Sequence, residues 1–198
     1  CCAAALADLS KCPGGEAQMV ADGAVPALRI VLGYAQAQQQ LLARDGLPPH
    51  RAAQRETARE VGAMCVQALY NLTCVTENYE GLDSVVKLIV QLPTGAGAAA
   101  APDTRKLEGV VHACCNCSNH FKLRMRMLEA GAVQTLAAVI KDLDDSRLKL
   151  NAATCLHNIS SARACRTDMV LRGAVPSLRA LADEKNHDTL YAVAATLQ

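Results

Sequence analysis

The sequence predicts an all-α protein, a right-handed α-solenoid built from repeats of about 42 residues. Three features predict this fold. An apolar stripe with helical spacing recurs along the chain, and an asparagine recurs beside that stripe. A glycine that can end one helix follows the stripe, and we call it the glycine signal. Hydrophobic residues make up 51% of the chain but aromatic residues only 3%. Such a composition suits closely stacked helices better than β-sandwiches, which favour aromatic and β-branched residues.

The clearest copy of the repeat lies at 147–176. Asn158 adjoins its stripe, and Gly173-Ala-Val-Pro follows beyond the end of the stripe. Glycine can end one helix in a left-handed conformation, and proline is tolerated in the first turn of the next helix. The stripe has steps of 4, 3, 1 and 3 and places five residues on one helix face: Leu148, Ala152, Cys155, Leu156 and Ile159.

The same stripe returns upstream of this copy. Asn116 stands one repeat before Asn158, and Asn71 stands one slightly longer repeat before Asn116. The matching apolar positions are Val110, Ala113, Cys114 and Cys117 in one copy, and Val61, Cys65, Ala68, Leu69 and Leu72 in the other. A degenerate copy opens the chain, with Asp8 at the asparagine position and Cys2, Ala5, Leu6 and Leu9 predicted to face inward. At the far end, Leu190, Ala194 and Leu197 fit a copy whose asparagine position would lie just beyond the last residue.

The glycine signal recurs at Gly23, Gly81, Gly131 and Gly173. At the fifth position after each glycine stands an aliphatic residue: Leu28, Val86, Leu136 and Leu178. A repeat of this length made only of helices is typical of helical solenoids.

The motif resembles the armadillo repeat, which has a short first helix, a Gly-Ala-(Val/Ile)-Pro opening to the second, and a long third helix with an Ala-Leu-x-Asn-Leu-like stretch. The corresponding stretches are ALYNLT, ACCNCS and CLHNIS. HEAT repeats are the near neighbour, and the Gly-Ala-Val-Pro break favours armadillo. The resemblance covers nearly all 198 residues.

The elements then follow in chain order. Residues 1–10 are predicted as the last helix of a partial repeat, residues 11–18 as a turn, and residues 19–40 as the break at Gly23 and a second helix with Leu28, Val31 and Leu32 inward. The remaining repeats are approximately 11–74, 75–119, 120–161 and a partial 162–198, with insertions at about 35–55 and 93–103. The first insertion is expected to lengthen the helix before it, and the second is low-complexity.

Asn71 and Gly81 are closer together than the asparagine and glycine of the other copies, so the short first helix is predicted to be missing there. Further helices are predicted at 105–119, 132–142, 147–160, 174–184 and 188–198. The opening inside a helix-like segment predicts a piece of a longer protein.

Charge and hydropathy exclude several classes of partner. Twenty basic and nineteen acidic residues give a net charge of +1, which argues against bulk capture of nucleic acid or a membrane surface. No segment approaches the ~18 apolar residues of a membrane span, and no signal peptide is visible. Five cysteines are predicted to face inward, where thiols act as small hydrophobes: Cys2, Cys65, Cys114, Cys117 and Cys155. We therefore predict a reduced, cytoplasmic protein. A cytoskeletal or flagellar location is compatible with this prediction.

The recurring asparagines are the best candidate for a binding site. The armadillo resemblance implies a concave face on which this asparagine pairs with the backbone of an extended peptide, since an amide supplies both a donor and an acceptor. The predicted partner-binding residues are Gln67, Asn71, His112, Asn116, Thr154 and Asn158. Importin-like receptors place tryptophan one turn before the asparagine, and this chain has none. The alternative is that each asparagine bonds to a neighbouring repeat and holds the two repeats together.

Each of these asparagines also begins an N-x-[ST] sequon. The repeat explains the sequons better than glycosylation does, because the positions lie inside predicted packed helices.

The other clusters of polar residues give weaker indications of a functional site. His112, Cys114, Cys115, Cys117 and His120 are metal-like, but only Cys114 and Cys117 have workable spacing and both match stripe positions, so no metal and no cofactor is predicted. A basic ridge that could receive an acidic partner or phosphate is predicted from Lys122, Arg124, Arg126, Arg163 and Arg166. Gly95-x-Gly97 lacks the context of a phosphate loop, and Cys155 and His157 point in different directions on a helix, so no catalytic residue is predicted.

The sequence therefore predicts a non-catalytic protein–protein interaction scaffold, an architectural component of a larger assembly such as a cytoskeletal, ciliary or flagellar complex. The alternative is an adaptor that binds an extended partner peptide along the concave asparagines. An enzyme is the remote alternative.

Overall fold

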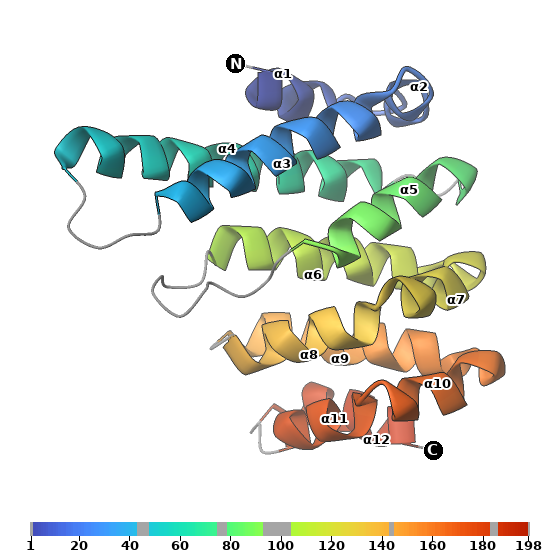
Figure 1. Cartoon of the computed structure of the whole chain (residues 1–198). Coiled ribbons are helices and arrows are strands. Elements are labelled where there is room, and N and C mark those ends of the chain that lie inside the picture. The colour runs from blue at the N-terminus through green and yellow to red at the C-terminus, as the bar shows by residue number, and fades with distance from the viewer. Residues whose placement is uncertain are drawn as a thin grey trace.

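The structure, a computed structural model, describes residues 2–42, 48–74, 79–92, 104–142, 145–182 and 186–197. Within these ranges the chain forms twelve α-helices and one short 3₁₀ helix, with no strand. Figure 1 shows the helices stacked in chain order along one axis, with α1 at one end and α12 at the other. This arrangement is an all-α solenoid, as the repeat predicts.

The helices fall into two rows joined by short helices at one edge (Figure 1). The third helices of the repeats form what we call the ladder row: α1 (Cys2–Leu9), α4 (Pro49–Leu72), α6 (Thr104–Asn119), α9 (Ser146–Ser161) and α12 (His187–Leu197), each packed on the next. The second helices form the other row: α3 (Ala24–Leu41), α5 (Tyr79–Val90), α8 (Ala132–Asp142) and α11 (Ala174–Ala182). The short helices are α2 (Glu16–Ala21), α7 (Phe121–Ala130), η1 (Arg163–Cys165) and α10 (Arg166–Leu171).

The predicted apolar stripes form the core between these rows. Val110 and Leu148 are fully buried on their helices, and Val61 is half-buried against the same core. The stripe thiols are buried as well, at Cys65, Cys114, Cys117 and Cys155. Because α4, α6 and α9 each have a helix of the ladder row on both sides, these stripes are largely removed from solvent.

The prediction is wrong for the two terminal helices. In α1, Cys2, Ala5 and Leu9 are exposed and Leu6 is half-buried, whereas Ala3 and Ala7 are buried, as is Ser10 directly after the helix. In α12, Ala194 and Leu197 are exposed and Leu190 is half-buried, whereas Thr189, Ala192 and Val193 are buried. The reason is that only one neighbour in the ladder row covers each of these helices, α4 for α1 and α9 for α12.

Glycines end the short first helices at three of the four predicted positions. Gly23, Gly131 and Gly173 have φ of 88°, 99° and 88°, the left-handed conformation that glycine adopts without a Cβ clash. Gly81 is the exception, because it lies inside α5 and marks no break. The predicted absence of a short first helix between Asn71 and Gly81 stays a prediction, because 75–78 lie outside the described residues.

The first insertion lengthens both helices that it joins. Helix α3 has 18 residues and α4 has 24, against 11 in α8 and 16 in α9. The predicted turn at 11–18 is shorter than expected, because α2 begins at Glu16. The second insertion, 93–103, lies outside the described residues. Among the described helices, none combines the length and apolar character that crossing a membrane requires.

Candidate functional site

The recurring asparagines bond back to the preceding repeat. Asn71 Nδ2 donates to Ser10 Oγ at 2.9 Å, and Asn116 Nδ2 donates to Thr73 Oγ1 at 3.1 Å. Asn158 Nδ2 donates in the same way to Ser118 Oγ at 3.0 Å. We call Asn71, Asn116 and Asn158 the ladder asparagines, and these three contacts the inter-repeat amide bonds.

The hydroxyl groups that accept these bonds are also donors. Thr73 Oγ1 donates to Tyr70 O at 2.6 Å, and Ser118 Oγ donates to Cys115 O at 2.7 Å. Each hydroxyl therefore joins its own helix end to the amide of the next repeat. Because the hydroxyl residue stands two positions after the ladder asparagine, the bond itself accounts for the N-x-[ST] pattern.

The second amide hydrogen is also used at two of the three positions. Asn116 Nδ2 lies 3.4 Å from Cys74 Sγ, and Asn158 Nδ2 lies 2.9 Å from Asn119 Oδ1. No donor among the described residues reaches Oδ1 of Asn116 or Asn158, whereas Gln67 Nε2 donates to Asn71 Oδ1 at 3.0 Å. Asn116 and Asn158 therefore offer acceptors, but not donors, to a partner. That these residues contact a partner stays a prediction.

The other three predicted partner-binding residues differ in how deeply they are buried and in what they contact. His112 is half-buried, and its ring centroid lies 5.7 Å from that of Tyr70, with the planes at 46°. Thr154 Oγ1 donates to Leu150 O of its own helix at 2.9 Å, and Gln67 is exposed. We call the surface of Gln67, Asn71, His112, Asn116, Thr154 and Asn158 the ladder face.

Sequence reasoning missed two neighbours of this face. Cys74 is an exposed thiol one turn beyond Asn71, and it contacts the amide of Asn116. His157 is half-buried next to Asn158, and its Nδ1 has no hydrogen-bond partner among the described residues. A step of three from Asn71, continued past the end of α4 at Leu72, leads to Cys74 and would have identified it.

Two residues of the predicted basic ridge bond to helix ends. Arg124 Nε donates to Ser118 O at 2.8 Å, and Arg166 Nε donates to Ser160 O at 2.9 Å. These carbonyls lie in the last turns of α6 and α9, where helix carbonyls lack intrahelical partners. The two arginines stand one repeat apart and make the same contact in successive repeats.

The other three residues of the predicted basic ridge do not make this contact with a helix end. Arg126 Nη1 lies 3.2 Å from Asp83 Oδ1, and Lys87 Nζ lies 2.9 Å from Asp83 Oδ2, so Arg126 joins α7 to α5. The hydrogen bond from Lys87, and then the charges of Lys87 and Arg126, hold the pKa of Asp83 below its ordinary value. Lys122 and Arg163 are exposed.

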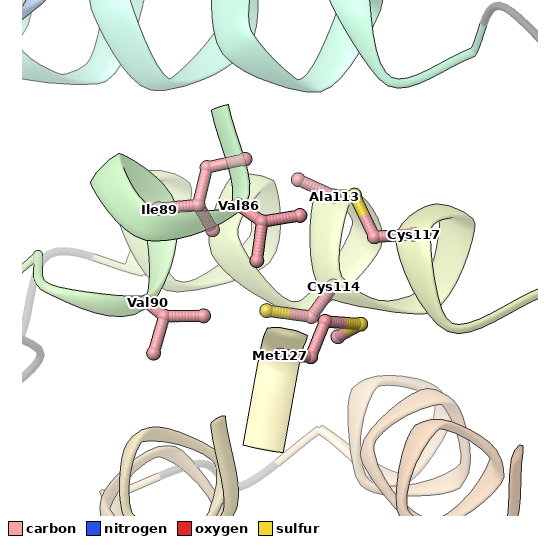
Figure 2. Close-up of a pocket in the computed structure, with 7 residues that line it drawn as sticks. All are labelled: Val86, Ile89, Val90, Ala113, Cys114, Cys117 and Met127. Carbon is pink, nitrogen blue, oxygen red and sulfur yellow. The ribbon is translucent and has the colours of Figure 1, made fainter. Parts of the chain in front are cut away.

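The metal-like cluster contains two core side chains. Figure 2 shows Cys114 and Cys117 of α6 beside Val86, Ile89 and Val90 of α5 and Met127 of α7. Burial raises the pKa of both thiols far above the ordinary value, which keeps them protonated. Cys155 Sγ donates to Cys114 O at 3.5 Å and links α9 to this layer. Within the described ranges, no group of three potential ligands could hold a metal ion.

Comparison with known proteins bears on the fold alone. Neither a protein-family model nor a curated protein matches this chain. Among solved structures, an engineered protein matches with a TM-score of 0.66 and 20% identity, over 98% of this chain and 70% of that chain. A computationally designed armadillo repeat protein for modular peptide recognition matches with a TM-score of 0.58 and 17% identity, over 87% of this chain and 80% of that chain. A designed armadillo repeat protein in complex with the peptide (KR)4 matches with a TM-score of 0.57 and 19% identity, over 96% of this chain and 80% of that chain. The chain therefore has an armadillo-like helical repeat fold.

Proposed function

We propose that this chain is a non-catalytic protein-interaction scaffold that binds an extended segment of a partner protein along the ladder face. The observation that carries the proposal is the pair of open Oδ1 atoms of Asn116 and Asn158, which stand at equivalent positions of adjacent repeats. An extended chain presents backbone N–H groups along its length, and these are the donors that an amide oxygen accepts. A similar fold holds a peptide in the designed protein in complex with (KR)4.

The contacts of the amides refine how a peptide would be held. The N–H groups of Asn116 and Asn158 are engaged within the protein, so a partner is bound through its own N–H groups rather than through paired donors and acceptors. The six residues of the ladder face include no carboxylate, so a strongly basic peptide finds no counter-charge on them.

The exposed thiol of Cys74 provides a test of this proposal. Peptides selected from a library of unstructured sequences for binding to the purified chain are added, and the rate of alkylation of each thiol is followed by mass spectrometry. We expect bound peptide to slow the alkylation of Cys74, while Cys12, which is exposed in the turn after α1, reacts at an unchanged rate. Gln67→Trp should weaken binding by crowding the face, whereas Gln134→Trp, at an exposed position on α8, should not. Selected peptides that leave Cys74 reactive would place the binding surface elsewhere and overturn the proposal.

A second candidate is an architectural role in a larger assembly, with a helical neighbour covering the end that carries α10 to α12. Val170 is 60% exposed and Val175 is 44% exposed, although Leu128 and Val133, at the equivalent positions one repeat earlier, are fully buried. Tyr191 on α12 is 78% exposed. These values favour burial of this end by a further helical element. Incorporation of a Val170→Lys, Val175→Lys variant into the native complex at the wild-type level would exclude this role.

A further inference from the structure

The two arginines that bond to helix ends are fixed in place by the protein. Arg166 Nε is held by Ser160 O, and no other partner of Arg166 is found among the described residues, so both of its Nη groups remain open. Arg124 is held at Ser118 O, and its Nη1 donates to Ser161 Oγ at 2.6 Å, which leaves Nη2 and the second hydrogen of Nη1. A guanidinium held at Nε presents its remaining N–H groups with little loss of side-chain freedom on binding.

The surroundings of these arginines are predominantly basic. Arg163 is exposed three residues before Arg166, and no ion pair is found for Arg124, Arg163 or Arg166 within the described part of the chain. The nearby carboxylates are Asp168 and Glu129, which act with Arg124 on the thiol of Cys165. The positive charge at this edge is therefore not fully matched by the protein itself.

An exposed aromatic ring completes this surface. Phe121 is 72% exposed, and the guanidinium carbon of Arg124 lies 5.9 Å from its ring centroid. Phenylalanine and arginine are both residue types that are enriched at protein interfaces. We call Phe121, Arg124, Arg163 and Arg166 the arginine edge.

The arginine edge adjoins the ladder face. Arg124 contacts Ser161, which lies one turn beyond Asn158, and Asn158 itself bonds to Asn119 at the end of α6. A segment that pairs with the open Oδ1 atoms of Asn116 and Asn158 thus has the arginine edge within reach of its side chains.

We propose that the arginine edge receives the acidic side chains of the partner segment, with a carboxylate on the open N–H groups of Arg166 and an apolar side chain on Phe121. This inference rests on the proposed function and adds the chemistry of the partner. Planar carboxylates match the fork of a guanidinium in two parallel hydrogen bonds. The chain's net charge of +1 and the small size of the edge favour a short acidic protein segment over nucleic acid.

The test uses fluorescence polarisation with labelled peptides of repeating Glu-Ser-Ala, Gln-Ser-Ala and Lys-Ser-Ala units. We expect the Glu peptide to bind most tightly and to lose affinity as NaCl is added. Arg163→Glu, at an exposed position with no side-chain hydrogen bond or ion pair among the described residues, should weaken the binding of the Glu peptide about tenfold. Arg166→Gln, whose amide can still donate to Ser160 O, should weaken it to a similar degree. Arg51→Glu changes the net charge identically at an exposed position in the first turn of α4, far from the edge, and should leave the affinity unchanged.

Three results would overturn the inference while leaving the proposed function intact. The Glu and Gln peptides could bind equally well and both protect Cys74. Arg51→Glu could weaken the Glu peptide as much as Arg163→Glu does, which would indicate bulk charge. Inorganic phosphate or a single-stranded oligonucleotide could bind more tightly than the Glu peptide and depend on the same arginines, which would assign the edge to phosphate. If no peptide, selected or designed, binds the chain at all, the proposed function fails and the inference fails with it.

Discussion

Single polar side chains connect one repeat to the next in this solenoid. Asn158 gives one amide hydrogen to Ser118 and the other to Asn119, and the Ser118 hydroxyl donates in turn to Cys115 O. A half-buried group that loses its partner lowers stability, because the remaining polar atom stays desolvated. The ladder asparagines therefore have a structural role whether or not a partner binds.

Replacing Asn158 by alanine should lower the free energy of unfolding by about 1–2 kcal/mol, since Ser118 and Asn119 lose their donor. Asn151→Ala is the matched control, because Asn151 is half-buried on the same helix and makes no inter-repeat bond among the described residues. Urea unfolding followed by circular dichroism measures both variants. Equal stability of the two would mean that the inter-repeat amide bond contributes nothing.

Asp83 should make stability depend on acid. Its pKa is lowered in the folded protein, so its contribution is complete above the ordinary Asp pKa of about 3.9 and is lost as the pH falls through the lower folded-state value. At neutral pH, Asp83→Asn should cost about 0.5–1 kcal/mol, because both cations are largely exposed. The difference from wild type should shrink as the pH falls below about 3.9. Asp168→Asn, at an exposed position with no ion pair among the described residues, is the control; a difference that persisted in acid would contradict this account.

At the scale of helices, one close approach depends on a missing side chain. Gly109 is buried where α6 crosses α4, and a Cβ there would lie 2.5 Å from Val66 Cγ1. The contact lets the two ladder-row helices approach closely, which places Asn116 within reach of Thr73. Gly33 on α3 has no atom within 4 Å of the Cβ position and serves no such purpose.

Gly109→Ala should therefore destabilise the protein even though alanine is the better helix former. Overpacking costs about 1–3 kcal/mol, against a helix-propensity gain of about 1 kcal/mol. Gly33→Ala should show only the gain. In a Val66→Ala background the cost of Gly109→Ala should vanish, and a double-mutant cycle of thermal unfolding measures this coupling. Additive effects would show that the contact with Val66 is not the cause.

At the scale of the whole molecule, the reactivity of the cysteine thiols distinguishes the buried core from the solvent-exposed surface. The nine described cysteines are free, and they divide into buried residues of the core and more accessible residues such as Cys2, Cys12 and Cys74. Burial raises the pKa of Cys65 to about 11, and it raises the pKa of Cys155 as well. Since the thiolate is the nucleophile, burial and protonation together suppress reaction in the core.

Pulsed iodoacetamide treatment of the native chain near neutral pH should therefore modify Cys2, Cys12 and Cys74 but leave Cys65, Cys114, Cys117 and Cys155 unmodified until urea unfolds the protein. Peptide mass spectrometry assigns each site. Modification of Cys114 at the rate of Cys74 in the folded protein would contradict the packing of α5 and α7 on α6.

The sequence by itself determined the helical class, the period, the positions of the ladder asparagines and most of the buried stripe, because these depend on periodicities within a single helix and on the left-handed glycines that end helices. Only the tertiary structure decided how the side chains are used. The amides of Asn116 and Asn158 bond to side chains of the preceding repeat, so spacing along one helix does not show that their N–H groups are engaged while their oxygens stay open. The same holds for the predicted ridge, where Arg126 pairs with Asp83 while Arg124 and Arg166 bond to helix ends. The exposure of Cys2, Leu9 and Leu197 also depends on how many neighbours cover a helix, which a repeating pattern does not specify.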